Sequence, residues 1–113
     1  MVHTTIYPHT NRKHRKGHVL PFALSDVLFI RGGSNCSYFI LKGGKEWQST
    51  YTMVFYGQYL PDHFVRIQRS YIINRWEVKR ICEDTKKVQL SDGTELSVSH
   101  PQWKAIKYQL QRQ

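Results

Sequence analysis

Short apolar runs separated by turn residues fill the chain from residue 19 onward. Runs of roughly four to eight residues that alternate or stay apolar are typical of β-strands, and clusters of Gly, Asn, Asp and Ser between them are typical of turns. Asp92–Gly93 in particular marks a tight hairpin. The pattern predicts a mostly β protein with strands near residues 19–22, 27–30, 37–41, 46–48, 64–69, 71–73, 78–81, 88–90 and 95–98.

Two segments change to helical spacing. In residues 49–60, hydroxyl residues that can cap a helix precede a stripe at i, i+3 and i+7, and Pro61 ends the segment. After residue 98, Ser99 is the expected cap and Pro101 falls in the first turn, where proline is tolerated. We expect two short helices that pack on the strands through Met53, Tyr56 and Leu60 in the first and Trp103, Ile106 and Leu110 in the second.

The most informative stretch is residues 64–74. An alternating run that contains Arg66, Gln68 and Arg69 stops at Ser70, and an apolar run resumes at Tyr71. A polar break inside strand-like sequence predicts a projecting corner flanked by buried residues. Such a corner would hold guanidinium groups rigidly toward a polyanion.

Residues 1–18 differ from the rest. They hold four Lys or Arg, four His and no acid, with few apolar side chains, so we expect a basic tail outside the domain formed by residues 19–113. His14 and His18 are four residues apart, but no carboxylate or cysteine lies near them, and a metal site is not expected. Basic arms of this kind also lie along phosphates or enter a minor groove.

The overall charge narrows the class of partner. The 113 residues form one domain, and 17 Lys and Arg against eight Asp and Glu give +9. A field of that sign favours nucleic acid over other partners, although it also suits a basic protein without one. Two distant cysteines, no long apolar run and no leader-like N-terminus predict a cytoplasmic protein that does not enter a membrane and needs no cofactor.

Three fragments resemble the LytTR family of bacterial DNA-binding domains. Residues 64–74 (FVRIQRSYIIN) are similar to its F-x-R-x-H-R-S-x-x-V-N core, and residues 89–99 (QLSDGTELSVS) to its D-G hairpin and L-P-V-S-R ending. Residues 27–38 and 53–60 also resemble its earlier strand and helix. The match runs in order over about residues 19–110.

The resemblance implies a fold and a partner. The fold would be about ten short strands in three antiparallel sheets with one or two short helices. The partner would be double-stranded DNA, with loops rather than a helix in successive major grooves. Pairing of two copies on direct half-sites and a separate signalling protein are further expectations, since the family is commonly fused to a receiver domain. Carried over, the DNA contacts would come from Ser34, Asn35, Ser37, Arg66, Gln68, Arg69, Ser70 and His100.

This chain departs from the family pattern where DNA contacts are expected. The family's histidine before the arginine is Gln68 here, its arginine after V-S is His100, and its frequent tyrosine after the asparagine is Cys36. These changes leave the fold intact and bear on which DNA sequence is preferred.

Arg69 is the strongest candidate for base recognition. Its planar guanidinium fits O6 and N7 of guanine together, and no acid lies near it in sequence. Gln68 or Asn35 could pair with adenine, and serine hydroxyls suit phosphates. Arg66 could instead pair with Asp62 or Glu77, Asn74 could cap a turn, Ser70 could be a turn residue, and Tyr71 could belong to the core.

Two other classes of function are weighed against this one. Tyr38, Phe39, Trp47, Tyr51 and Tyr59 could stack bases in a single-stranded nucleic-acid or RNA module, although most of them suit a core better. An enzyme is disfavoured because the chain has no nucleophile motif, phosphate loop or metal-ligand spacing.

Overall fold

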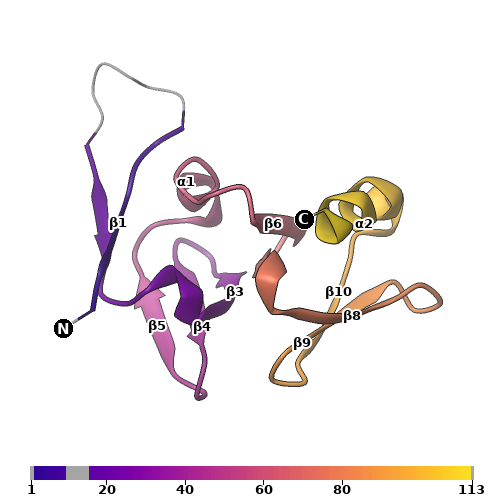
Figure 1. Cartoon of the computed structure of the whole chain (residues 1–113). Helices are drawn as coiled ribbons and strands as arrows, with labels where there is room; N and C mark the ends of the chain where they lie inside the picture. The colour runs from indigo at the N-terminus through magenta and orange to yellow at the C-terminus, as the bar shows by residue number, and fades with distance from the viewer. Residues whose placement is uncertain (1, 10–15, 113) are drawn as a thin grey trace.

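A five-stranded antiparallel sheet forms the centre of the computed structural model, which describes residues 2–9 and 16–112 (Figure 1). A second sheet has three strands, and a third is the β1–β2 hairpin. The prediction of a mostly β protein with about ten strands in three antiparallel sheets is confirmed. In sheet order, the central strands are β5 (Glu46–Ser49), β4 (Ser37–Leu41), β3 (Val27–Gly32), β7 (Tyr71–Asn74) and β6 (Phe64–Gln68).

The smaller elements cover the two faces of the central sheet. The three-stranded sheet has the order β10 (Glu95–Ser97), β9 (Lys87–Leu90), β8 (Val78–Cys82), and the hairpin pairs β1 (Thr4–Ile6) with β2 (His18–Leu20). Figure 1 places the β1–β2 hairpin at one end and the three-stranded sheet with α2 at the other. The helices are α1 (Met53–Gly57) and α2 (Trp103–Gln111), and short 3-10 turns span Leu24–Asp26, Arg75–Glu77 and His100–Gln102.

The continuous apolar run in β3 follows from burial on both faces. Val27, Leu28, Phe29 and Ile30 are all buried, and they divide between two core clusters. One cluster joins the central sheet to the three-stranded sheet and α2, and the other joins it to α1 and the β1–β2 hairpin. All six residues expected to face the core from the two helical segments are buried.

Helix α1 is shorter than the helical segment that the sequence predicted. Among the hydroxyl residues that precede it, Thr52 is the cap: its Oγ1 accepts a hydrogen bond from the amide of Phe55 at 3.3 Å. The α-helix ends at Gly57, and Leu60 reaches the core from the turn that follows. Ser99 makes no side-chain cap, because a 3-10 turn precedes α2.

The expectation that residues 1–18 lie outside the domain is wrong for residues 4–6. These residues form β1, and Ile6 is buried in the same cluster as Leu20. The sequence suggested a tail because a three-residue strand gives too short an alternation to detect, and the basic residues around it dominate the composition. The stretch with the highest density of basic residues, 10–15, lies outside the described residues.

His18 holds the hairpin to α1. Its Nε2 lies 3.1 Å from the Tyr56 hydroxyl, which is 2.6 Å from the Oγ of Ser49. The rings of Tyr51 and Phe55 contact the imidazole edge-on at centroid distances of 4.8 and 5.1 Å. Burial lowers the pKa of His18 below its usual value, so the neutral imidazole is the form that suits this contact.

We predict that Ile6→Ala lowers the free energy of unfolding by about 3 kcal/mol, because it removes buried methylene and methyl groups and leaves a cavity. Val19→Ala, in the paired strand but 57% exposed, is the matched control and should cost less than about 0.5 kcal/mol. Urea unfolding measures both. Equal, small effects would mean that β1 does not contribute to the core.

We also predict that stability falls as the solution is acidified from neutrality through pH 6.5. The folded pKa of His18 lies below 6.5. The unfolded chain therefore takes up a proton that the folded protein resists, and stability is lost below the unfolded value. Burial also lowers the pKa of His63, so His18→Gln should reduce the slope in this part of a thermal-melting profile against pH without abolishing it, whereas His3→Gln, at an exposed position, should leave it unchanged. A wild-type slope retained in His18→Gln would contradict the assignment.

Candidate nucleic-acid interface

The predicted corner is the turn between β6 and β7, and its backbone is held from two sides. The strand register slips between Arg66 and Gln68, so the chain bends before the turn. The amide of Gly32 donates to the Ser70 carbonyl at 2.9 Å, and the amide of Ser99 donates to the Ile67 carbonyl at 2.8 Å. The corner is thus attached both to β3 and to the segment that follows β10.

Arg66 stabilises the corner from within. Its Nη2 donates to the Arg69 carbonyl at 2.6 Å, and its Nε donates to the Gln68 carbonyl at 3.4 Å. The alternative pairing with Asp62 or Glu77 is not formed among the described residues, and Glu77 bonds to Lys42 and Ser91 instead. The carbonyls of a tight turn point outward and need donors, and the adjacent guanidinium supplies them.

Arg69 stands at the tip of the corner. Its side chain is exposed and has no hydrogen bond or ion pair to any residue that the structure describes. Its own carbonyl is fixed by Arg66, so the point from which the side chain extends is ordered. A guanidinium without an internal partner, on a backbone whose position is fixed, suits the recognition of an external acceptor.

Gln68 has one of its two amide hydrogens engaged. Its Nε2 donates to the Ser97 carbonyl at 3.0 Å, which joins the corner to the end of β10. The remaining hydrogen and the amide oxygen would still allow a contact with an adenine edge. The side chain is therefore held in place as well as suited to recognition.

The turn between β3 and β4 forms a second part of the interface. The Gly33 amide donates to the Cys36 carbonyl at 2.9 Å, and Ser34 and Asn35 are exposed at the tip. A side chain at Gly33 would place its Cβ 2.7 Å from the Cys36 sulfur, so a larger residue there would require the Cys36 side chain to move. Ser34 and Asn35 are accessible for DNA contact.

Ser37 was wrongly predicted to contact DNA. It is fully buried, and its Oγ donates to the Tyr51 carbonyl at 2.8 Å. The sequence could not distinguish it from Ser34, because both follow the glycines of the turn. The pleat of β4 decides the outcome, since it turns Ser37 toward the core and leaves Ser34 outside.

Asn74 is a structural residue, as the turn-capping alternative predicted. Its side chain is fully buried; it donates to the Val27 carbonyl at 3.0 Å and accepts from the Trp76 amide at 3.1 Å. Tyr71 is half-buried and packs against the core. Ser70 is half-buried within the turn, where its carbonyl accepts the Gly32 amide.

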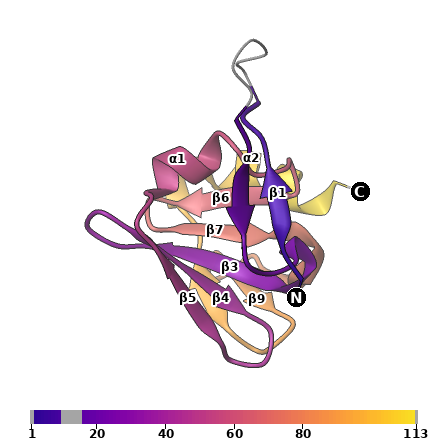
Figure 2. The same cartoon turned by 90° about the vertical axis from the view of Figure 1, so that its left-hand side faces the viewer.

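The predicted contact regions converge on one side of the molecule. A groove of about 300 Å³ lies between Ser34 and the pair Arg66 and Arg69, and another of about 480 Å³ lies between the same arginines and residues 99–102. Figure 2 shows the β3–β4 turn and the end of β6 projecting toward the same side. His100 is exposed beside the second groove. Arg66 and Arg69 therefore form the ridge that both grooves share.

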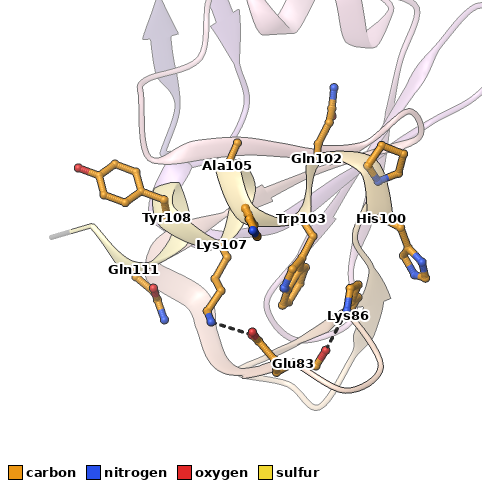
Figure 3. Close-up of a pocket in the computed structure, with 11 residues that line it drawn as sticks. Glu83, Lys86, His100, Gln102, Trp103, Ala105, Lys107, Tyr108 and Gln111 are labelled. Carbon is orange, nitrogen blue, oxygen red and sulfur yellow. Dashed lines mark hydrogen bonds and ion pairs between the residues drawn. The ribbon is translucent and has the colours of Figure 1, made fainter.

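Sequence reasoning missed Pro101 and Gln102, which line the second groove. Lys86 and Lys104 line a third groove together with His100, and Figure 3 shows Lys86 and His100 in it. The sequence could have indicated Lys104 and Gln102, because each lies within four residues of the predicted contact residue His100. Lys86 comes close only through the pairing of β9 with β10.

The aromatic residues proposed to stack bases are mostly covered. Phe39 is fully buried, Trp47 packs against it, and Arg31 lies over the Tyr38 ring at 4.5 Å. Tyr51 is 45% exposed, but its ring stacks on Phe55. Across residues 2–9 and 16–112, no cluster of three potential metal ligands and no helix long and apolar enough to cross a membrane occurs.

Comparison with known sequences places this interface in a family. The LytTr DNA-binding domain model matches residues 17–111. The chain belongs to the LytTR family. The family's domain is described as DNA-binding, which makes this chain a DNA-binding domain. No curated protein matches the chain.

The LytTR fold is also shown by solved structures. One is described as the LytTr DNA-binding domain of a methyl-accepting/DNA response regulator from Bacillus cereus. It shares 18% sequence identity with this chain at a TM-score of 0.72, and the alignment covers 96% of this chain and 99% of that one. At this identity the likeness establishes the fold, and the residues that contact DNA must be argued from this chain itself.

We predict that Arg66→Lys loosens the corner while keeping its charge. A lysine cannot donate to two carbonyls with a planar fork, so we expect a loss of about 1 kcal/mol in unfolding free energy and faster amide hydrogen exchange in residues 68–71. Hydrogen exchange measured by NMR reports the loss in unfolding free energy, through the slowest amides, and the exchange rates of residues 68–71. Unchanged exchange at the corner would show that the two hydrogen bonds of Arg66 are not needed to order it.

Proposed function

We propose that this LytTR domain binds a specific sequence of double-stranded DNA through the ridge of Arg66 and Arg69 and the turns on either side, and that it acts in this way as a transcription regulator. The observation that carries the proposal is Arg69, whose exposed guanidinium has no partner among the described residues although its backbone is fixed. Preorganisation of this kind lowers the entropy lost on binding.

The shape of the ridge suits a major groove. That groove is roughly 12 Å wide and admits a two-stranded β-ribbon, and the β6–β7 turn is the end of such a ribbon. Arg69 would contact guanine, while Gln68 or Asn35 would contact adenine. Ser34, Ser70 and His100 would bond phosphates or base acceptors on either side.

The arrangement on DNA is proposed from the family. Two copies on direct half-sites would double the number of base contacts available to a domain of this size. Signals would reach the domain through a partner protein or a fused receiver domain. The Bacillus cereus relative, whose description is that of a response regulator, is consistent with this proposal.

We predict that Arg69→Ala reduces the preference for the cognate duplex over a scrambled duplex by roughly 5- to 150-fold, the equivalent of about 1–3 kcal/mol for a bidentate arginine–guanine contact. The cognate duplex would come from selection of random sequences with the wild-type protein. Fluorescence anisotropy at fixed salt measures both affinities, and Lys45→Ala, at the far end of β4, controls for the lost charge.

Two results would contradict this assignment. Equal loss on both duplexes would assign Arg69 to the phosphate backbone. An unchanged preference would remove Arg69 from recognition altogether. Circular dichroism should show that the variant remains folded, since the Arg69 side chain contributes no hydrogen bond to the described structure.

Single-stranded nucleic acid is the other candidate ligand. Only Tyr51 among the five proposed stacking residues is exposed, so a run of stacked bases lacks a platform. In the same anisotropy assay, duplex should outcompete a single strand of the same sequence at equal salt.

A further inference from the structure

The third groove runs along α2, beyond the ridge of Arg66 and Arg69. It has a volume of about 890 Å³ and lies between α2 and the turn that joins β8 to β9. Trp103 forms an apolar part of its wall, and three lysines but only one acid, Glu83, line it (Figure 3). The charged and titratable groups that line it are Glu83, Lys86, His100, Lys104, Lys107 and Tyr108.

The charge in this groove is positive because its one acid is already paired. Lys107 Nζ lies 2.7 Å from the carboxylate of Glu83. That hydrogen bond is also the main reason that the pKa of Glu83 lies below its usual value. Lys86 Nζ donates a long hydrogen bond, 3.5 Å, to the Glu83 carbonyl (Figure 3), but neither Lys86 nor Lys104 has a carboxylate partner among the described residues. Two uncompensated ammonium groups therefore remain in the groove.

Lys86 is held in position by its surroundings. Its backbone is in the left-handed region, with φ of 52°, and its carbonyl accepts a hydrogen bond from the Val98 amide at 2.9 Å. Its Nζ lies 5.6 Å from the centre of the Trp103 ring. A non-glycine residue in this conformation costs energy, and such costs are found where the position of a side chain matters.

The groove continues from the ridge. Pro101 and Gln102 line both this groove and the one beside Arg69, and His100 lies at the junction. Helix α2 has nine residues, so the groove extends about 14 Å along it. Over that length one strand of B-DNA carries about four phosphates. A DNA strand that leaves the ridge on this side would meet Lys86 and Lys104, the two lysines without a carboxylate partner.

The groove on the other side of the ridge has no lysine among the described residues that line it. The groove toward the β3–β4 turn is lined by Gly32, Gly33, Ser34, Thr52, Met53, Val54 and Ser70 besides the two arginines of the ridge. None of these residues is cationic. Phosphate contacts should therefore be strongest on the α2 side, which would make the protected stretch of DNA asymmetric about the bases that the ridge contacts.

We propose that the groove along α2 binds the phosphate backbone of the DNA strand that flanks the recognised bases, with Lys86 and Lys104 as the salt-dependent contacts. This inference rests on the proposed DNA binding by the ridge and adds the direction in which the DNA continues. Phosphate contacts fix orientation and affinity without reading sequence, so these lysines and Arg69 have separable effects.

The test is the salt dependence of binding in Lys86→Gln/Lys104→Gln, measured by fluorescence anisotropy on the selected duplex and on its scrambled form. The control is Lys42→Gln/Lys45→Gln, which removes the same charge from the β4–β5 turn, at the opposite end of β4 from the ridge. Loss of two phosphate contacts should reduce the slope of log affinity against log salt by about 1.8. The control should change it by less than half as much, and the ratio of the two affinities should stay at the wild-type value in both.

An unchanged slope in Lys86→Gln/Lys104→Gln, or an equal fall in the control, would overturn the proposal. Hydroxyl-radical footprinting adds a second readout, because the variant should lose protection on one side of the recognised bases only. Symmetrical loss would also contradict the proposal. A wild-type protein that binds both duplexes equally would instead contradict the proposed sequence recognition, while the slopes would still decide the role of the lysines.

Discussion

Two backbone hydrogen bonds to the β6–β7 corner determine how this domain presents its charges. The Gly32 amide bonds the Ser70 carbonyl, and the Ser99 amide bonds the Ile67 carbonyl. The first joins the corner to the end of β3, and the second joins it to the segment between β10 and α2. Because these bonds connect three separate parts of the sequence, residues near 34, 69 and 100 come to lie on one side of the molecule. Arg66 then bonds the carbonyls of the turn, which leaves the Arg69 side chain free.

The core explains why this arrangement is stable in a small domain. The central sheet is covered on both faces, by α2 and the three-stranded sheet on one side and by α1 and the β1–β2 hairpin on the other. The strands that carry the corner are anchored in the core by Val65, Ile67, Ile72 and Ile73, which belong to the two clusters. Moving the corner would disturb both clusters, so its position is set by packing that lies outside the DNA contact itself.

Much of the fold could be predicted from apolar periodicity, because a strand with a covered face must place apolar residues toward it. The strands from β3 to β10, both helical stripes and the corner follow from that rule. The sequence did not show which face Ser37 would occupy, which donor would satisfy the turn carbonyls, or that three residues near the N-terminus would pair with β2. These outcomes depend on strand register and on contacts between residues far apart in the chain. Lys86 illustrates the same limit, since only the β9–β10 pairing brings it near His100.

The central claim is that DNA meets one continuous surface, made by the β3–β4 turn, the β6–β7 corner and the start of α2. Amide chemical shifts recorded by NMR during titration with a selected duplex test it most directly. The account predicts that the largest changes fall in residues 33–36, 66–70 and 97–104, with little change at the β4–β5 turn or at the exposed Trp76. Largest changes at residues 42–47 or around Trp76, with the corner unaffected, would contradict it.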